Sequence, residues 1–235
     1  MFRLTLLGNI KKSERTDAVD VLIEDSYPRK EFFLVSTLST GIATIGLLTD
    51  SMPLLIGSMI IAPLLYPIMG AGMAIAVRSS KLFIKSIGTS MFATLFALIF
   101  AMALTQLFKT DLTLNHDALI FRMWPSTAMG VVALFSGFVS SLAITKPTLN
   151  TSLSGVAVSV SLIPPVAATG IGIVINDWQV AQGAAQLFLL NLVTIMFAAT
   201  LIFSYLDFGK DQSWAVDKSL KEEKEKTDAA EKPTK

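Results

Sequence analysis

Two apolar segments interrupted by proline carry the residue types most able to bind a solute. Pro63 and Pro67 lie in one segment, and Pro164 and Pro165 lie in the other. Because proline lacks an N–H and clashes with the preceding turn, each pair is expected to bend or unwind a helix near its centre. The freed carbonyls then need a partner, and the following half-helix begins with a partial positive charge suited to an anion. We predict a solute site between the two breaks; the alternative is a plain proline kink relieved by packing.

Polar groups and glycines around these breaks complete the predicted site. Asn191, in an otherwise apolar run, could contact a solute or form an interhelical hydrogen bond worth about 0.6 kcal/mol. The glycines at positions 70, 72, 170 and 172 either present backbone to a ligand or allow close helix packing. Hydroxyls in the first apolar run either line a polar path or bond to their own backbone: Ser36, Thr37, Ser39, Thr40 and Thr44. The predicted ligand-binding residues are Pro63, Tyr66, Pro67, Gly70, Ser161, Pro164, Pro165, Thr169 and Asn191.

Motifs for catalysis or metal binding are absent from the sequence. It contains no nucleophile elbow, P-loop, His-Glu-x-x-His motif or acidic metal cluster. With no cysteine and one histidine, His116, it offers neither a thiolate zinc site nor a histidine cluster. We therefore expect no enzymatic activity, no cofactor and no metal. A net charge of +1 provides no field that would attract a nucleic acid polymer.

The distribution of charge identifies the elements that must position these residues. Charged residues make up only 16% of the chain, against about 25% in soluble domains. Residues 32–108 and 127–206 together contain 157 positions and six charges. Such a composition excludes a cytosolic enzyme, a DNA-binding protein and a disordered chain. It predicts an integral membrane protein whose partner is the lipid bilayer.

Six apolar runs are long enough to cross a bilayer as helices, which takes about 20 residues each. They span residues 32–49, 53–77, 82–108, 127–145, 152–175 and 183–206. A β-barrel is disfavoured, because its strands are about 10 residues long and alternate in polarity. We therefore predict an all-α membrane protein with six transmembrane helices, the second and fifth broken by proline.

Lysine and arginine predict the orientation of these spans. The two ends of the chain and the loops after the second and fourth spans carry 17 of them, and the opposite loops carry two. This asymmetry follows the positive-inside rule and places both termini on the cytoplasmic side of the membrane. No Asp or Glu lies deep in a span, which argues against a proton pump.

The segments outside the spans have separate expectations. Residues 1–31 form a cytoplasmic segment in which 12–25 could be a surface helix with Val19, Leu22 and Ile23 on one face, either as a docking face or as a solvated lead-in. Residues 109–126 form an extracytoplasmic loop. The mixed-charge tail, residues 207–235, is expected to be disordered or a frayed helix, with a membrane-binding switch as the sharper alternative.

An internal repeat divides the apolar part in two. At an offset of 98 residues, Leu54–Val77 aligns with Ser152–Ile175 and six of 24 positions are identical, including Pro67 with Pro165 and Gly72 with Gly170. The offset relates the three spans of residues 32–108 to the three of residues 127–206. Because three is odd, the second copy must cross the membrane in the opposite sense. Inverted repeats of this kind are typical of secondary transporters, and a purely structural duplication is the alternative.

The run Leu55-Ile56-Gly57-Ser58-Met59-Ile60-Ile61-Ala62-Pro63-Leu64, followed by Pro67-Ile68, resembles the prokaryotic "domain of unknown function 389" family. In the second half, Leu162-Ile163-Pro164-Pro165, Asn176-Asp177-Trp178 and Leu190-Asn191-Leu192-Val193 fit the same family. The resemblance covers about residues 30–205. It implies a multi-span prokaryotic membrane protein and does not imply a reaction.

Together these features favour a transporter or channel for a small solute, with an anion as the best fit to the half-helix termini. The alternative is a membrane protein without transport, which binds a small anionic metabolite such as a nucleotide or acts as an oligomeric scaffold. Both hypotheses expect a homo-oligomer, and the scaffold hypothesis expects it to form through small-residue faces that a substitution such as Gly72→Leu would disrupt.

Overall fold

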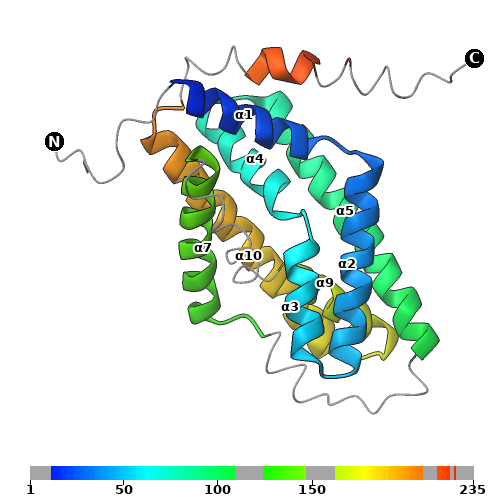
Figure 1. The fold of residues 1–235 in the computed structure, drawn as a ribbon. Helices are drawn as coiled ribbons and strands as arrows, with labels where there is room; N and C mark the ends of the chain where they lie inside the picture. The colour runs from blue at the N-terminus through cyan, green and yellow to red at the C-terminus, as the bar shows by residue number, and fades with distance from the viewer. Residues whose placement is uncertain (1–11, 109–123, 147–161, 209–215, 223–224, 226–235) are drawn as a thin grey trace, which may run out of the picture.

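The computed structural model describes residues 12–108, 124–146, 162–208, 216–222 and 225, and its regular elements are all helical (Figure 1). Residues 216–222 form a short additional helix. In chain order the labelled helices are α1 (Lys12–Ser26), α2 (Lys30–Leu48), α3 (Met52–Ile61), α4 (Leu65–Ala76), α5 (Ser80–Phe108), α7 (Thr127–Thr145), α9 (Ile163–Val174) and α10 (Trp178–Tyr205).

Within these described residues, four helices are long and apolar enough to cross a membrane: α2, α5, α7 and α10. The pair α3 and α4 would form a fifth span that is bent by 48°. These helices lie within a few residues of five of the six predicted spans. For the remaining span, predicted at residues 152–175, the structure describes only the part from residue 162 onward, which contains the 12-residue helix α9.

The sizes of buried and exposed side chains fit a bundle surrounded by lipid. Along the middle of α5 the buried positions are small, as at Ala93, Ala97 and Ala101, while Phe92 and Phe96 are more than half exposed. Small residues let helices approach closely inside a membrane, where the hydrophobic effect does not drive packing. A continuous apolar exterior of this extent is unusual for a soluble monomer.

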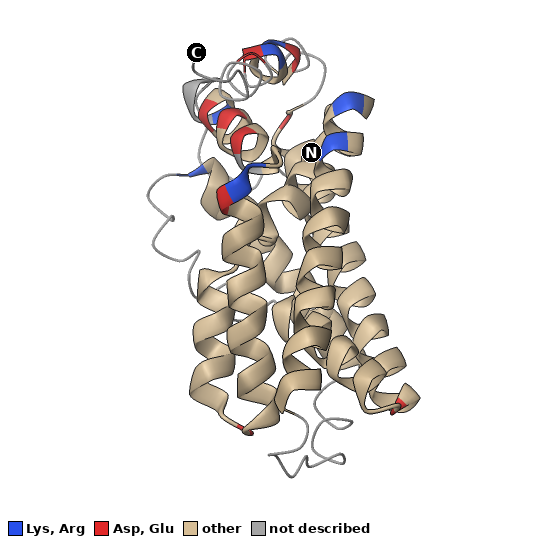
Figure 2. Ribbon diagram, turned by 90° about the vertical axis from the view of Figure 1, so that its right-hand side faces the viewer, with Lys and Arg blue, Asp and Glu red and all other residues tan. Residues whose placement is uncertain are grey.

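Charged side chains separate the two ends of the bundle. Among the described residues, Lys and Arg gather at the end that carries α1 and residues 216–222, which we call the charged end (Figure 2). The turns between α2 and α3 and between α9 and α10 lie at the opposite end, which we call the far end (Figure 1). The colouring in Figure 2 shows acidic residues but no Lys or Arg in the described part of the far end.

Helix α1 lies across the charged end, and its buried face is the one predicted. Val19, Leu22 and Ile23 are at most 1% exposed, so the expectation of a helix with these residues on one face is confirmed. The face packs mainly against α4, with further contacts to α7 and α5. In the tail, residues 216–222 follow the helical alternative, with Val216 and Leu220 buried.

Helices α4 and α9 share their length and the way they end. Each has 12 residues, and the bounds Leu65–Ala76 and Ile163–Val174 differ by 98 positions at both ends. After each helix, one residue takes a left-handed conformation, Arg78 with φ 57° and Asn176 with φ 58°. The next N–H then donates back to the helix, Ser79 to the Ala74 carbonyl and Asp177 to the Gly172 carbonyl, both at 2.9 Å. Such a helix end satisfies carbonyls that would otherwise lack donors.

The same offset relates two close helix crossings. A Cβ on Gly72 of α4 would lie 2.6 Å from the Cβ of Ala199 in α10. A Cβ on Gly170 of α9 would lie 2.8 Å from the Cβ of Ala101 in α5. Gly170 and Ala199 are 98 positions after Gly72 and Ala101. Because both glycines contact helices of the same chain, Gly72 does not belong to a free small-residue face through which copies could associate.

Candidate functional site

The break between α3 and α4 is held by a hydroxyl from the neighbouring helix. Residues 62–64, with Pro63 at their centre, separate the two helices. One turn earlier, the buried Ser39 Oγ of α2 donates to the Ser58 carbonyl, and Ser58 Oγ donates to the Leu55 carbonyl at 2.7 Å. The end of α3 is thus fixed to α2 by the hydrogen bond from the Ser39 side chain.

Ser36 lies one turn along α2 from Ser39, toward the charged end. Because α2 and α3 form an antiparallel hairpin, this step brings Ser36 to the level of the break (Figure 1). The Ser36 side chain is fully buried, and its Oγ has no hydrogen-bond partner among the described residues. A buried hydroxyl without a partner costs free energy, which makes Ser36 a candidate contact for a solute at the break.

The first turn of α9 lies at the same height in the bundle. Gly170 of α9 and Gly41 of α2 both pack against the stretch of α5 around Phe100 and Ala101. Both helices run toward the far end (Figure 1). Pro165 lies five residues before Gly170 in α9, and Ser36 lies five residues before Gly41 in α2, so the two residues are about equally far from that end. Since α2 and α9 are in contact, Ser36 and the start of α9 lie on the same level of adjacent helices.

Asn191 approaches this level from α10. The backbone of Gly172 in α9 packs against the backbone of Ala181, and the two helices are antiparallel. Pro165 lies seven residues before Gly172 in α9. Seven residues after Ala181, the antiparallel α10 reaches position 188, which is within one turn of Asn191. Asn191 is 4% exposed on the buried face of α10. The break, Ser36, the start of α9 and Asn191 therefore form one polar level in an apolar bundle.

The groups on this level that can interact with a solute are the dipoles of the helix starts, the Ser36 hydroxyl and the Asn191 amide. None of the described residues on this level adds a fixed charge. Of the first four residues of α9, only Ile163 and Val166 have an N–H, since the two between them are proline. The first turn of α4 also lacks the N–H of Pro67, and the Tyr66 N–H donates to the Pro63 carbonyl at 3.3 Å. Each helix start keeps its partial positive charge but offers fewer donors than an ordinary one. Such a level suits a small solute that is neutral or carries a single negative charge.

The other predicted residues have different surroundings. Gly70 lies further toward the charged end, where a Cβ would meet the hydroxyls of Ser26 and Ser86. Thr169 Oγ1 donates to the Pro165 carbonyl at 2.8 Å, so it bonds within its own helix. Tyr66 is half-buried in the first turn of α4. Ser161 lies outside the described residues.

A hollow of about 440 Å³ lies elsewhere, between the start of α7 and the middle of α10. Its lining includes Ser126, Gly130 and Leu134 from the α7 side and Leu190 and Thr194 from α10, and it includes none of the nine predicted ligand-binding residues. Within the described residues, no group of three or more His, Cys, Asp or Glu side chains could hold a metal ion.

Residues 59–197 match the family described as "Domain of unknown function (DUF389)". This chain is a DUF389 protein. It is 31% identical over 194 residues to the "Uncharacterized protein MJ0678" of Methanocaldococcus jannaschii, an alignment that covers 82% of the chain and 59% of that relative. The chain therefore spans less than two thirds of the length of the relative it matches. No solved structure matches it.

The DUF389 match contains the break, α9 and Asn191, and it excludes α1 and residues 216–222. It also excludes Ser36 and Ser39, which sequence reasoning considered only as members of a general set of hydroxyls. Their spacing on one face of α2 was visible, but the choice of Ser36 depends on the absence of a hydrogen-bond partner. Thr40 and Thr44 illustrate the contrast, since they bond to carbonyls of their own helix at 2.9 Å and 2.8 Å.

Proposed function

We propose that this DUF389 protein is a transporter or channel for a small solute, built from two inverted three-helix repeats with six membrane spans. The observation that carries the proposal is the pair of equivalent crossings, Gly72 on Ala199 and Gly170 on Ala101. In each, the half-helix of one repeat packs on the last helix of the other. Interlocked repeats with half-helices that start near mid-membrane are the architecture in which secondary transporters place their sites.

The sense of the repeats follows from the ends of α4 and α9. Helix α4 runs from the break toward the charged end, and α9 runs from the same level toward the far end (Figure 1). Two half-helices that start at one level and end at opposite faces are what an inverted repeat requires. We orient the charged end toward the cytoplasm, because Lys and Arg of the described residues gather there.

The proposed solute site is the polar level of Ser36, the break at residues 62–64, the first turn of α9 and Asn191. A small neutral or singly negative solute would interact with the two helix starts, the Ser36 hydroxyl and the Asn191 amide. A multiply charged anion is a poorer fit, because this level has few N–H donors and no cation among the described residues.

Uptake into liposomes containing the purified protein tests the proposal. Nitrate, acetate, inorganic phosphate and glycerol are offered to these vesicles and to protein-free vesicles, with binding followed in parallel by thermal shift. We expect protein-dependent flux of nitrate, acetate or glycerol, and little of phosphate. Binding without flux would favour the alternative of a non-transporting ligand-binding protein, and neither binding nor flux across a broader metabolite panel would refute the proposal.

Ser36→Ala locates the site. Removal of a buried hydroxyl that has no partner should leave the melting temperature of the protein unchanged or slightly raised. If the solute contacts Ser36, flux should fall about tenfold, as expected for one lost hydrogen bond in the transport pathway. The matched control is Ser90→Ala, also a buried serine, whose Oγ donates to the Ser86 carbonyl of its own helix. Equal flux in both variants would remove Ser36 from the proposed site.

A further inference from the structure

The end of α1 covers the seam between α4 and α5 at the charged end. Ser86 Oγ donates to Ser26 Oγ at 3.2 Å, and Thr89 Oγ1 donates to the Ser26 carbonyl at 2.7 Å. Gly70 of α4 completes this contact, since a Cβ there would overlap the Ser26 hydroxyl. All three hydroxyl residues are at most 3% exposed. If α1 moved away, Ser86, Thr89 and the bare backbone at Gly70 would be uncovered at the charged end.

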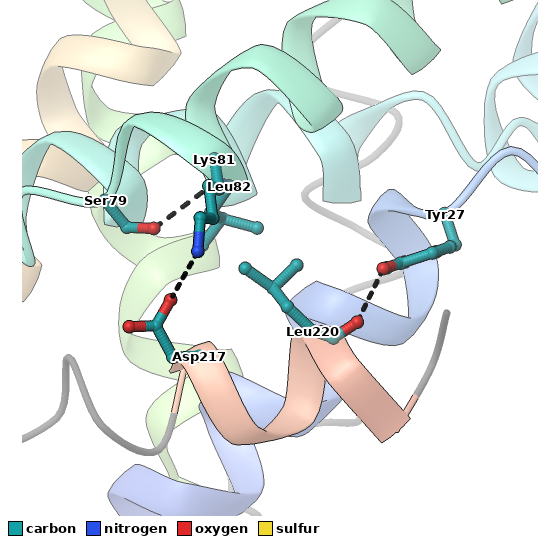
Figure 3. Close-up of polar contacts among 6 residues, drawn as sticks. All are labelled: Tyr27, Ser79, Lys81, Leu82, Asp217 and Leu220. Carbon is teal, nitrogen blue, oxygen red and sulfur yellow. Dashed lines mark hydrogen bonds and ion pairs between the residues drawn. The ribbon is translucent and has the colours of Figure 1, made fainter. Parts of the chain in front are cut away.

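Residues 216–222 hold α1 in this position from the outside. Tyr27 Oη, just after α1, donates to the Leu220 carbonyl at 2.8 Å in a buried hydrogen bond (Figure 3). Ser219 Oγ donates to Asp20 Oδ1 at 2.6 Å. Val216 and Leu220 are 0% and 9% exposed, so the short helix docks by its apolar face as well as by these polar contacts.

The first turn of α5 provides the third side of this assembly. Lys81 Nζ lies 3.9 Å from Asp217 Oδ1, and the helix start itself is capped by Ser79, whose Oγ accepts the Leu82 N–H at 3.4 Å (Figure 3). Lys85 Nζ lies 4.2 Å from the centre of the Tyr27 ring, in the geometry of a cation–π contact. Residues 216–222 therefore bridge α1, which covers the seam, to α5, which forms one side of it.

We propose that α1 and residues 216–222 form a terminal latch that closes the cytoplasmic mouth of the solute pathway and must release for a solute to pass. The inference rests on the proposed transport function. Both parts of the latch lie outside residues 59–197, the DUF389 match. The polar contacts of the latch are single hydrogen bonds and an exposed ion pair, which can break one at a time. At the crossings of Gly72 and Gly170, by contrast, the helix backbones are in close contact.

A reversible cross-link tests the latch. The chain contains no cysteine, so Asp20→Cys with Ser219→Cys introduces the only thiols, and a short bis-maleimide with a disulfide in its linker can join them by adding both thiols. In vesicles that take up nitrate, acetate or glycerol, linking should reduce uptake at least tenfold, and a reductant should restore it. The control is the same reagent on each single cysteine variant. Uptake that is equal before and after linking would overturn the latch.

A second measurement does not depend on transport. Ser90→Cys places a thiol one turn below Ser86, at a buried position whose Oγ bonds only within α5. Val216→Asp with Leu220→Asp should undock the short helix, so labelling of this thiol by a membrane-impermeant maleimide should rise at least tenfold. Thr105→Cys, buried near the other end of α5, should label equally in both backgrounds.

The two arms separate the possible failures. If the native protein shows no flux and undocking still increases labelling at position 90, the transport proposal fails and the latch stands as a cover of the seam. If flux is present and neither linking nor undocking changes flux or labelling, the latch fails and the transport proposal stands.

Discussion

Helices α4 and α9 cross their partner helices alike and differ in what packs against the second glycine of each. Gly72 and Gly170 occupy equivalent positions at the two crossings. Each helix has a second glycine two residues away, before the crossing in α4 and after it in α9. Gly172 packs against the backbone of Ala181 in α10, whereas Gly70 packs against the side-chain hydroxyls of Ser26 and Ser86. The second glycine of α9 is thus packed by backbone, and that of α4 is packed by side chains.

This difference indicates which end can open. Helix α9 is closed by α10, the next helix along the chain, after a connection of three residues that bends back on α9 through Asn176 and Asp177. Helix α4 is closed by α1, which comes much earlier in the sequence and lies outside the DUF389 match. Helix α1 at the charged end can therefore move away without breaking a helix pair of the core, whereas α10 at the far end cannot.

The largest effect is expected for Gly172→Ala. A Cβ at this position would lie 2.6 Å from the Ala181 nitrogen and 2.9 Å from its Cα, so backbone must move. We expect a loss of about 2–3 kcal/mol of unfolding free energy, in the range for overpacking, measured as a lower melting temperature in detergent. Gly57→Ala is the control, because nothing lies within 4 Å of its Cβ and alanine favours the helix. A Gly172→Ala protein as stable as the Gly57→Ala protein would contradict a backbone-closed far end.

Changing either crossing glycine, Gly72 or Gly170, to alanine should cost about 1–2 kcal/mol of unfolding free energy. The two crossings should differ in how far a compensating Ala→Gly change in the partner helix restores stability. At Gly170 the tightest contact is the Ala101 Cβ at 2.8 Å, and the next lies at 3.2 Å. Ala101→Gly should therefore restore most of the melting temperature to Gly170→Ala. At Gly72 the Met196 carbonyl lies at 2.8 Å in addition to Ala199, so Ala199→Gly should restore less. Equal rescue at both sites would show that the crossings are energetically the same.

The sequence predicts the apolar helices and the equivalence of α4 with α9 more readily than it predicts the contacts of α1 and residues 216–222. Long apolar runs place α2, α5, α7 and α10 within a few residues, because span length and composition are local properties. The matched prolines and glycines also identify α4 and α9 as equivalent segments. The role of Gly70 required its partner, and nothing in the local pattern relates it to Ser26. Likewise the contact of Tyr27 with Leu220 joins residues 193 positions apart, which no periodicity can reveal.

A smaller and more selective effect is expected for Gly70→Ala. The neighbouring atoms are ends of serine side chains, which can turn away, so the core should keep its melting temperature within about 1 kcal/mol of unfolding free energy. Helix α1 should instead be displaced, and hydrogen exchange at residues 18–26 should increase. Ser26→Gly in the same protein should reverse the displacement, because it removes the hydroxyl that the new methyl meets. Loss of core stability equal to that of Gly172→Ala would erase the distinction between the two ends.

The smallest effects belong to the polar contacts of residues 216–222, and they should rank by burial. Tyr27→Phe removes a buried hydrogen bond and should weaken docking of the short helix by about 1 kcal/mol, seen as faster proteolysis of the tail. Asp217→Asn removes an ion pair whose side chains are 79% and 57% exposed, and it should cost about 0.5 kcal/mol or less. The ion pair is screened by salt, whereas the buried hydrogen bond is not, so only the difference between native protein and Asp217→Asn should vanish at high ionic strength. If the Tyr27→Phe difference vanished with salt as well, electrostatic attraction rather than buried contact would hold the short helix on α1, and the closure at the charged end would be looser than its packing indicates.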